Sequence, residues 1–170
     1  MALACRVLSL LCGISGLITG ARSELGASRN QCPEGWTRLD NRCFIIRNAI
    51  LTFAEAEENC KSLGGNLASI HSPVEQALID GLTEVLLEPD ISGDFWIGLS
   101  FSLQEQTFVW TDGSDFDFDI LLESVGAIDG IAPCSVSDGE AWFETSCTDS
   151  NRFICVRDVF QCVSICMQEE

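Results

Sequence analysis

The chain has 170 residues, of which 26 are aspartate or glutamate and nine are lysine or arginine, so its net charge at pH 7 is −17. This length accommodates one ordinary domain with short extensions. Between Lys61 and Arg152 the sequence contains 17 acidic residues and no lysine or arginine. Such a surface repels phosphate backbones, which excludes nucleic acid as a partner, and it favours solubility or affinity for cations and basic partners.

The first residues have the layout of a secretory signal peptide. Arg6 supplies a positive charge, an apolar run begins at Val7, and small residues at positions 19–21 offer a cleavage site. This predicts a signal peptide over residues 1–21, followed by a flexible lead-in over residues 22–31. Because no other stretch approaches the roughly 20 apolar residues of a spanning helix, we expect a secreted, extracellular protein without a membrane anchor.

The number of cysteines is consistent with a secreted protein. Ten cysteines are present, and Cys5 and Cys12 would leave with the signal peptide. The remaining eight are Cys32, Cys43, Cys60, Cys134, Cys147, Cys155, Cys162 and Cys166. An even number in an oxidising compartment predicts a disulfide framework. A zinc site is disfavoured, because the sequence has no CxxC pair and only one histidine, His71.

The first predicted elements are a hairpin and a helix. Residues 36–39 and 43–46 form two short strands around a turn at Asp40 and Asn41. Thr52 can then cap a helix, with Glu55 three residues later completing a capping box. The pair Gly64-Gly65 ends this helix.

A second helix is predicted from Ser72, with Pro73 at its first position and Glu75 as the capping-box partner. Its apolar residues recur at helical spacing, which predicts that this stripe faces the core. The stripe consists of Val74, Ala77, Leu78, Leu82, Val85 and Leu86.

Beyond Pro89 the pattern changes to short strands. Apolar runs occur at 95–99, 108–110, 141–143 and 153–156, with a turn over residues 111–114 and an irregular stretch up to about residue 133. Helices early and strands late predict an α+β domain with antiparallel strands.

Several of these motifs, in this order, resemble the C-type lectin domain. They are the segment from Cys32 to Trp36, Cys43-Phe44, Trp96-Ile97-Gly98-Leu99, Trp110-Thr111-Asp112-Gly113-Ser114, and Cys147 followed by Phe153-Ile154-Cys155. The resemblance extends over residues 32–157 and leaves a cysteine-containing tail at 158–170. It is similar in type to the small secreted single-domain lectins and type II antifreeze proteins of fish.

The resemblance also implies a disulfide pairing. It would join Cys32 to Cys43, Cys60 to Cys155, and Cys134 to Cys147. Cys162 and Cys166 lie beyond the family pattern. Either they pair with each other, or one of them joins a second chain in a disulfide-linked homodimer.

Sugar-binding members of the family use a calcium ion, and the resemblance locates the expected ligands. A Glu/Gln-Pro-Asn/Asp loop would fall near Glu123-Ser124-Val125, a further glutamate at Ala132, and a Trp-Asn-Asp triplet at Trp142-Phe143-Glu144. Only Glu123 and Glu144 keep a carboxylate from this set. Calcium requires about 6–8 oxygen ligands, so we expect no cofactor and no calcium at the usual site.

A substitute cation site, or ligand-binding rim, could be built from Asp115, Asp117, Asp119 and Asp129. The simpler interpretation is a solvated acidic loop. Asp115-Phe116-Asp117-Phe118-Asp119 alternates as an edge strand does, which predicts acids outward and rings inward.

An enzyme is not expected. A serine or cysteine triad would have to use His71, which directly precedes the predicted cap Ser72, and no glycine-rich phosphate loop is present. The sequence therefore predicts a secreted binding module that recognises a glycan, a protein or a microbial surface. The alternatives are a calcium-dependent lectin with a rearranged site, and an extracellular structural or antifreeze-like protein.

Overall fold

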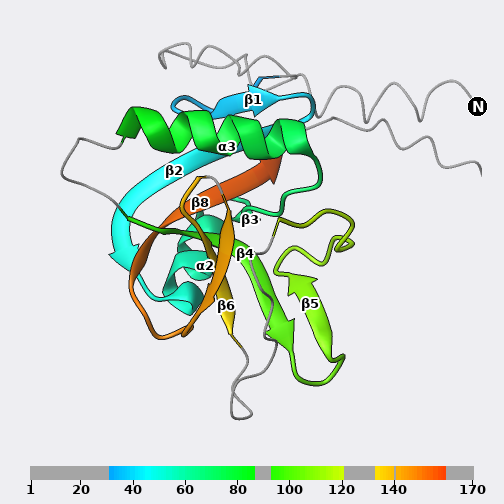
Figure 1. Cartoon of the computed structure of the whole chain (residues 1–170). Coiled ribbons are helices and arrows are strands. Elements are labelled where there is room, and N and C mark those ends of the chain that lie inside the picture. The colour runs from blue at the N-terminus through cyan, green and yellow to red at the C-terminus, as the bar shows by residue number, and fades with distance from the viewer. Residues whose placement is uncertain (1–30, 87–92, 121–132, 140, 160–170) are drawn as a thin grey trace, which may run out of the picture.

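A computed structural model describes residues 31–86, 93–120, 133–139 and 141–159 (Figure 1). Two helices and eight strands occur in these ranges. The helices are α2 (Phe53–Ser62) and α3 (Pro73–Leu86). The strands are β1 (Thr37–Leu39), β2 (Arg42–Leu51), β3 (Asn66–Leu67), β4 (Phe95–Ser102), β5 (Thr107–Trp110), β6 (Cys134–Ser137), β7 (Trp142–Thr145) and β8 (Asn151–Asp158). The predicted α+β class is confirmed.

All eight strands belong to one sheet, in the order β1-β2-β8-β4-β6-β7, with β3 paired to β8 and β5 paired to β4. Every pairing is antiparallel except that of β4 with β8, which is parallel. The last strand thus lies beside the first hairpin, and the Val159 amide donates to the Asn41 carbonyl at 2.7 Å. The two ends of the domain meet there (Figure 1).

The predicted capping of α2 is present. The Thr52 amide and hydroxyl both donate to the Glu55 carboxylate, at 3.1 and 2.7 Å. Gly64 has a φ of +80°, a left-handed conformation that ends the helix without a Cβ penalty. Gly65 is required for a different reason, because a Cβ there would lie 2.1 Å from the Val156 carbonyl oxygen.

The start of α3 departs from the predicted capping box. Ser72 Oγ accepts a hydrogen bond from the Glu75 amide at 3.2 Å, as expected of a cap. The Glu75 carboxylate does not return to Ser72. Instead it accepts from the His71 amide at 2.7 Å and pairs with Arg42 at 2.6 Å. A side chain from β2 therefore completes the helix start.

The predicted core stripe of α3 is wrong in part. Val74 is 63 % exposed and Ala77 is exposed, whereas Leu78 and Leu82 do pack against the core. The side chains of Val85 and Leu86 lie outside the described residues. The buried positions are Gln76, Ile79 and Thr83. Polar residues can occupy this face because Gln76 bonds to the Trp142 indole at 2.8 Å and to the Gly139 carbonyl at 3.2 Å.

The core has two parts that follow the two-residue period of the strands. On β4, Phe95, Ile97 and Leu99 belong to one cluster, which includes Ile79 of α3. Trp96 belongs to the other, which includes Phe53 of α2 and Cys155 of β8. Successive strand residues point to opposite faces of a sheet, so each helix covers its own face.

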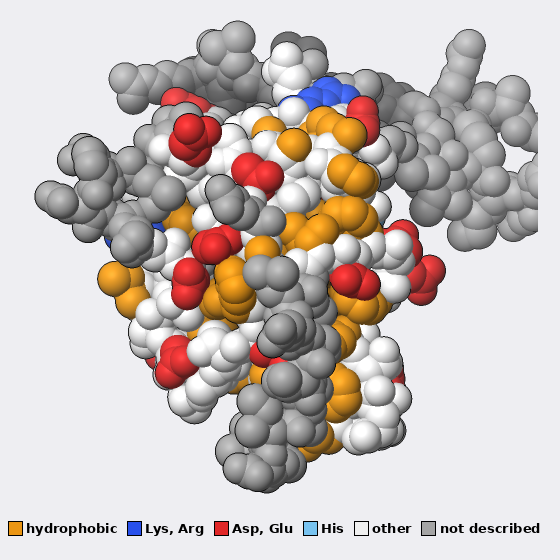
Figure 2. Space-filling model, viewed as in Figure 1, with side chains coloured by type: hydrophobic (Ala, Val, Ile, Leu, Met, Phe, Trp, Pro, Cys, Tyr) orange, Lys and Arg blue, Asp and Glu red, His pale blue; other side chains and the backbone are white. Residues whose placement is uncertain are grey.

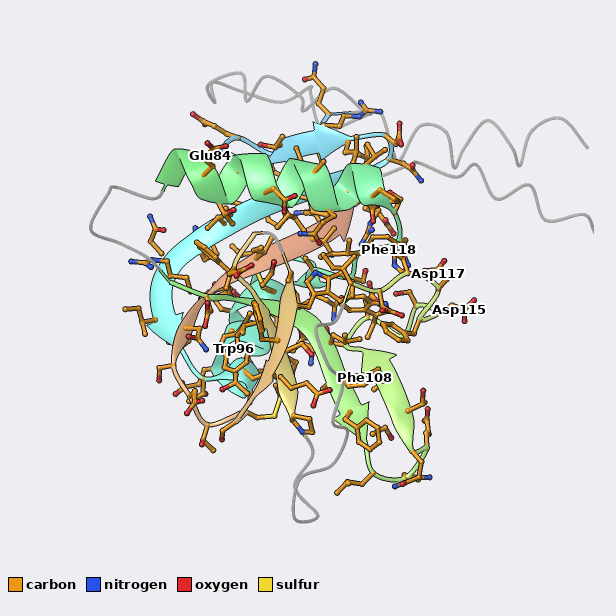
Figure 3. The ribbon with its side chains drawn as sticks, viewed as in Figure 1. Glu84, Trp96, Phe108, Asp115, Asp117 and Phe118 are labelled. Carbon is orange, nitrogen blue, oxygen red and sulfur yellow. A yellow bond between two sulfur atoms is a disulfide. The ribbon has the colours of Figure 1, made fainter. Side chains whose placement is uncertain are left out.

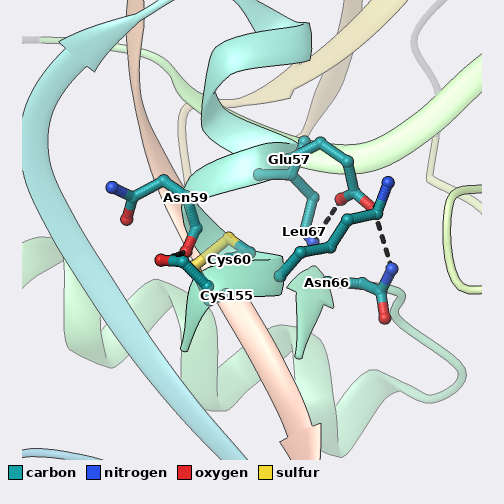
Figure 4. Close-up of a disulfide and its surroundings, with 8 residues drawn as sticks. Glu57, Asn59, Cys60, Asn66, Leu67 and Cys155 are labelled. Atoms are coloured by element: carbon teal, nitrogen blue, oxygen red, sulfur yellow. Dashed lines mark hydrogen bonds and ion pairs between the residues drawn. A yellow bond between two sulfur atoms is a disulfide. The ribbon is translucent and has the colours of Figure 1, made fainter. Parts of the chain in front are cut away.

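Three disulfides close the structure, and their pairing is the one that the family resemblance implied. They join Cys32 to Cys43, Cys60 to Cys155, and Cys134 to Cys147. Beside the second bridge lies Glu57, which is only 7 % exposed (Figure 4). Its carboxylate accepts from the Leu67 amide at 2.8 Å and the Asn66 amide group at 2.7 Å. The bridge and this carboxylate together attach α2 to β8 and β3.

We expect Cys60→Ser and Cys155→Ser each to lower the free energy of unfolding by about 2–5 kcal/mol, because each opens the same long loop. The double variant should be no less stable than either single variant. Urea midpoints of the secreted protein measure this. Cys32→Ser is the control, since its bridge has a sequence separation of 11 rather than 95 and should stabilise less. Additive losses at Cys60 and Cys155 would contradict the prediction.

Candidate binding site

The β7 triplet is part of the packed interior. Trp142 is fully buried, and its ring makes edge contacts with Trp110 and Phe118. Phe143 packs against the second core cluster on the opposite face. Glu144 is half-buried and lies opposite Ser135 in the register of β6 and β7. Of the three side chains, only Glu144 offers an oxygen to a ligand.

The segment after the turn, residues 115–120, is extended but does not form the predicted edge strand, because it has no ladder partner among the described strands. The predicted alternation is correct. Phe116, Phe118 and Ile120 pack against the core, while the three aspartates between them are exposed. Ring packing holds the segment, together with a hydrogen bond from the Trp142 amide to the Ile120 carbonyl at 3.5 Å. Figure 3 shows Asp115 and Asp117 projecting from its outer side.

His71 anchors this segment to the start of α3. Its Nδ1 lies 2.8 Å from Asp117 Oδ1, and its ring makes an edge contact with Trp110. The hydrogen bond from His71 lowers the pKa of the Asp117 carboxyl below its usual value. His71 therefore has the structural position that the sequence predicted for it.

The acidic residues do not converge on one point. Within residues 31–86, 93–120, 133–139 and 141–159, no three His, Cys, Asp or Glu side chains are grouped so that they could hold a metal ion. Asp115, Asp117 and Asp119 follow one exposed edge, and Asp117 is engaged by His71. Glu123 and Asp129, together with Val125 and Ala132, lie outside the described residues.

A polar network that the sequence analysis missed centres on Arg42. Its guanidinium pairs with Glu75 at 2.6 Å and donates to the Ser69 carbonyl at 3.1 Å and hydroxyl at 2.6 Å. The Ser69 hydroxyl in turn donates to Asp112. Arg42 and Glu75 are largely buried, with 16 % and 12 % of their side chains exposed. The network connects β2, the start of α3 and the turn after β5.

The sequence indicated this network only by an arginine at the start of an apolar strand. The residues that Arg42 contacts could not be predicted from that position. Asp112 is held by Ser69 on one oxygen and by the Ser114 amide, at 2.9 Å, on the other. Burial acts to raise the pKa of Asp112, but the hydrogen bonds from Ser114 and Ser69 outweigh it and lower the pKa below its usual value.

An open cleft of about 980 Å³ lies beside the network. Its walls come from the β1–β2 turn, the Gly64-Gly65 turn, the turn after β5 and the end of β8. The polar side chains around it include Asn41, Asn66, Ser114 and Asp158. The cleft thus borders the Arg42 network, on the side where the ends of the domain meet.

Residues 50–157 match the family described as the lectin C-type domain. The chain belongs to this family. Among curated proteins, it is 32 % identical to a type-2 ice-structuring protein of Hemitripterus americanus, over 82 % of this chain and 85 % of that protein. It is 33 % identical to the galactose-specific lectin nattectin of Thalassophryne nattereri, over 76 % of this chain and 82 % of that lectin.

Solved structures of related proteins have the same fold. The crystal structure of a calcium-independent type II antifreeze protein superposes with a TM-score of 0.62 at 31 % identity, over 75 % of this chain and 95 % of that one. The C-type lectin domain is a non-enzymatic binding domain, which confirms the expectation that the chain is not an enzyme. Three disulfides are consistent with an oxidising, extracellular compartment. Neither described helix is long and apolar enough to cross a membrane.

We expect Asp112→Asn to lower the free energy of unfolding by at most about 1 kcal/mol at neutral pH, because it weakens hydrogen bonds to a charged group that solvent partly screens. Since the folded pKa of Asp112 lies below the usual value near 4, the stability it supplies is present above that pH and is lost as the pH falls through the folded pKa. Urea titrations of both proteins from pH 7 to pH 2 should therefore converge at the acid end. The exposed Asp115→Asn is the control, and a difference that stays constant with pH would contradict the prediction.

Proposed function

We propose that this protein is an exported binding module that recognises glycans on a surface without calcium at the site its relatives use. Membership of the C-type lectin family supports a binding role. The observation that carries the calcium-independent part is the packing of Phe143. At the position where the resemblance calls for an amide ligand, a phenylalanine ring contributes to the core.

The remaining oxygens support the same proposal. Glu144 offers one half-buried carboxylate, and Asp117 is already engaged by His71. A calcium ion needs about 6–8 oxygen ligands at 2.3–2.6 Å, held together from several directions. The carboxylates along residues 115–119 instead alternate with rings that point into the core. A ligand would then be held by hydrogen bonds and by the shape of the surface.

The relatives indicate which ligands to test first. Nattectin is named as a galactose-specific lectin. A second relative is named as a lactose-binding lectin of Anguilla japonica, and it is 39 % identical over 53 % of this chain and 51 % of that lectin. Galactosides are therefore the first sugars for a glycan array on the mature protein, run with and without EDTA. Binding that survives EDTA supports the proposal, and binding abolished by EDTA contradicts it.

A second candidate function is binding to ice. It is favoured by the 32 % identity to a type-2 ice-structuring protein and by the superposition on a calcium-independent type II antifreeze protein. The sequence shows no array of threonines of the kind a flat ice-binding face would use. Thermal hysteresis of the mature protein distinguishes this candidate from glycan binding.

We expect the melting temperature of the mature protein to be unchanged by millimolar calcium or by EDTA. A bound ion would stabilise the folded state by mass action, by about 2.7 kcal/mol at 100 times its Kd. Isothermal titration should likewise show no micromolar calcium site. Glu144→Gln is the control, because it removes a carboxylate and should leave this insensitivity unchanged. A melting temperature raised several degrees by calcium in the wild type, but not in Glu144→Gln, would contradict the prediction.

The proposal also includes secretion of the protein and disulfide bonding of the tail, residues 158–170. The layout of residues 1–21 supports a signal peptide, and Cys162 and Cys166 supply two thiols beyond the three bridges. An exposed free thiol rarely persists in an oxidising compartment, so we expect a disulfide-linked dimer to be an accessible state. Non-reducing gel electrophoresis of the secreted protein tests this, with Cys162→Ser/Cys166→Ser as the control. A single monomer band before and after reduction would exclude the dimer.

A further inference from the structure

Strand β5 lies at an edge of the sheet. It pairs with β4 on one side, and no described strand pairs with its other side. Natural proteins usually protect such an edge with lysine, proline or a bulge. The sequence of β5, Thr107-Phe108-Val109-Trp110, contains neither lysine nor proline. Its register with β4 is regular over four residue pairs.

The hydrogen bonds of β4 show which groups of β5 point outward. The Phe101 amide donates to the Pro133 carbonyl at 3.0 Å, so its main-chain groups point away from β5. Phe108 is the residue opposite Phe101. In an antiparallel ladder such a pair exchanges no hydrogen bonds, so the Phe108 N–H and C=O point away from β4. Trp110 lies two residues further along the strand, so its N–H also points away from β4.

A groove of about 560 Å³ runs along this outer edge. One wall is β5 itself and the other is the segment from Gly113 to Phe116. The half-buried side chains of Val109 and Phe116 line the groove and supply an apolar surface. The groove therefore offers both main-chain groups and an apolar surface to a chain lying along β5.

The charged side chains that line the groove are both acidic. They are Glu105 and Asp115, and both are exposed. Figure 2 shows acidic and hydrophobic side chains interspersed over this side of the molecule, with blue side chains only toward its upper and left margins. A cationic segment would complement this surface, and an anionic one would be repelled.

We propose that the outer edge of β5 binds an extended basic segment of a partner protein, which adds to the sheet as a further strand. The main-chain groups of Phe108 and the Trp110 N–H would pair with the segment. Its apolar side chains would contact Val109 and Phe116, and its lysine or arginine would lie near Glu105 and Asp115. A second copy of this chain is disfavoured at this edge, because its own β5 edge carries the same acidic side chains, Glu105 and Asp115. A dimer linked through the tail cysteines does not require this contact. This proposal does not depend on the proposed glycan binding.

The test uses an acetylated, amidated peptide of alternating lysine and valine with the mature full-length protein. Two peptides of equal length serve as controls: one with glutamate in place of lysine, and one with every backbone amide N-methylated. Titration calorimetry gives the affinity, and amide hydrogen exchange followed by NMR gives the site. We expect only the unmodified basic peptide to bind, with increased protection of the Phe108 amide.

Variants test whether binding depends on the charges at this groove or only on the net negative charge of the chain. Glu105→Lys/Asp115→Lys reverses two exposed charges at the groove and should weaken binding about tenfold. Glu84→Lys reverses an exposed charge on α3, on the opposite side of the view from Phe108 and Asp115, and should change affinity less than about twofold (Figure 3). The proposal is overturned if the N-methylated peptide binds equally well, if Glu84→Lys weakens binding as much as the double variant, or if no peptide binds.

Discussion

The pairing of β8 with three other strands is the constraint on which the rest of the fold depends. β8 is antiparallel to β2 and β3 and parallel to β4, and its Cys155 is bonded to Cys60 of α2. The last strand of the domain therefore sits between its first hairpin and the strands of its second half. The contacts that β8 makes with β2, β3 and β4 therefore join residues that are distant in sequence. Folds of this kind close long loops before they gain packing, which makes the buried Cys60–Cys155 bridge valuable to the folded state.

Local signals in the sequence predicted the elements well, because capping and periodicity act within a few residues. The hairpin, both helix starts and the rings-inward pattern of residues 115–119 all follow from such signals. Contacts between distant residues could not be predicted in this way. Gln76 is buried because it meets Trp142, 66 residues away, and Glu75 leaves the helix cap because Arg42 lies within reach. The core face of α3 was predicted incorrectly because its polar residues were expected to face solvent.

The expected calcium ligands were located through family resemblance, and the structure shows how the side chain at one of these positions packs. Phe143 is half-buried, and its ring packs against the second core cluster, which also holds the Cys134–Cys147 bridge. Replacing Phe143 with asparagine would remove these apolar contacts, so the exchange should lower the stability of the fold.

The acidic half of the chain carries an electrostatic cost that its own residues do not relieve. Burial, with Asp138 nearby, raises the pKa of the Asp94 carboxyl above its usual value, because both effects disfavour its charged form. Lysine and arginine in the described chain occur only in β1, β2, α2 and β8, outside the long acidic stretch. The exposed carboxylates of Glu105 and Asp115 oppose pairing of β5 with the same edge of a second copy, a role that lysine fills in many proteins. The same two charges would attract a basic chain, so protection of the edge and partner selection can have one physical origin in this protein.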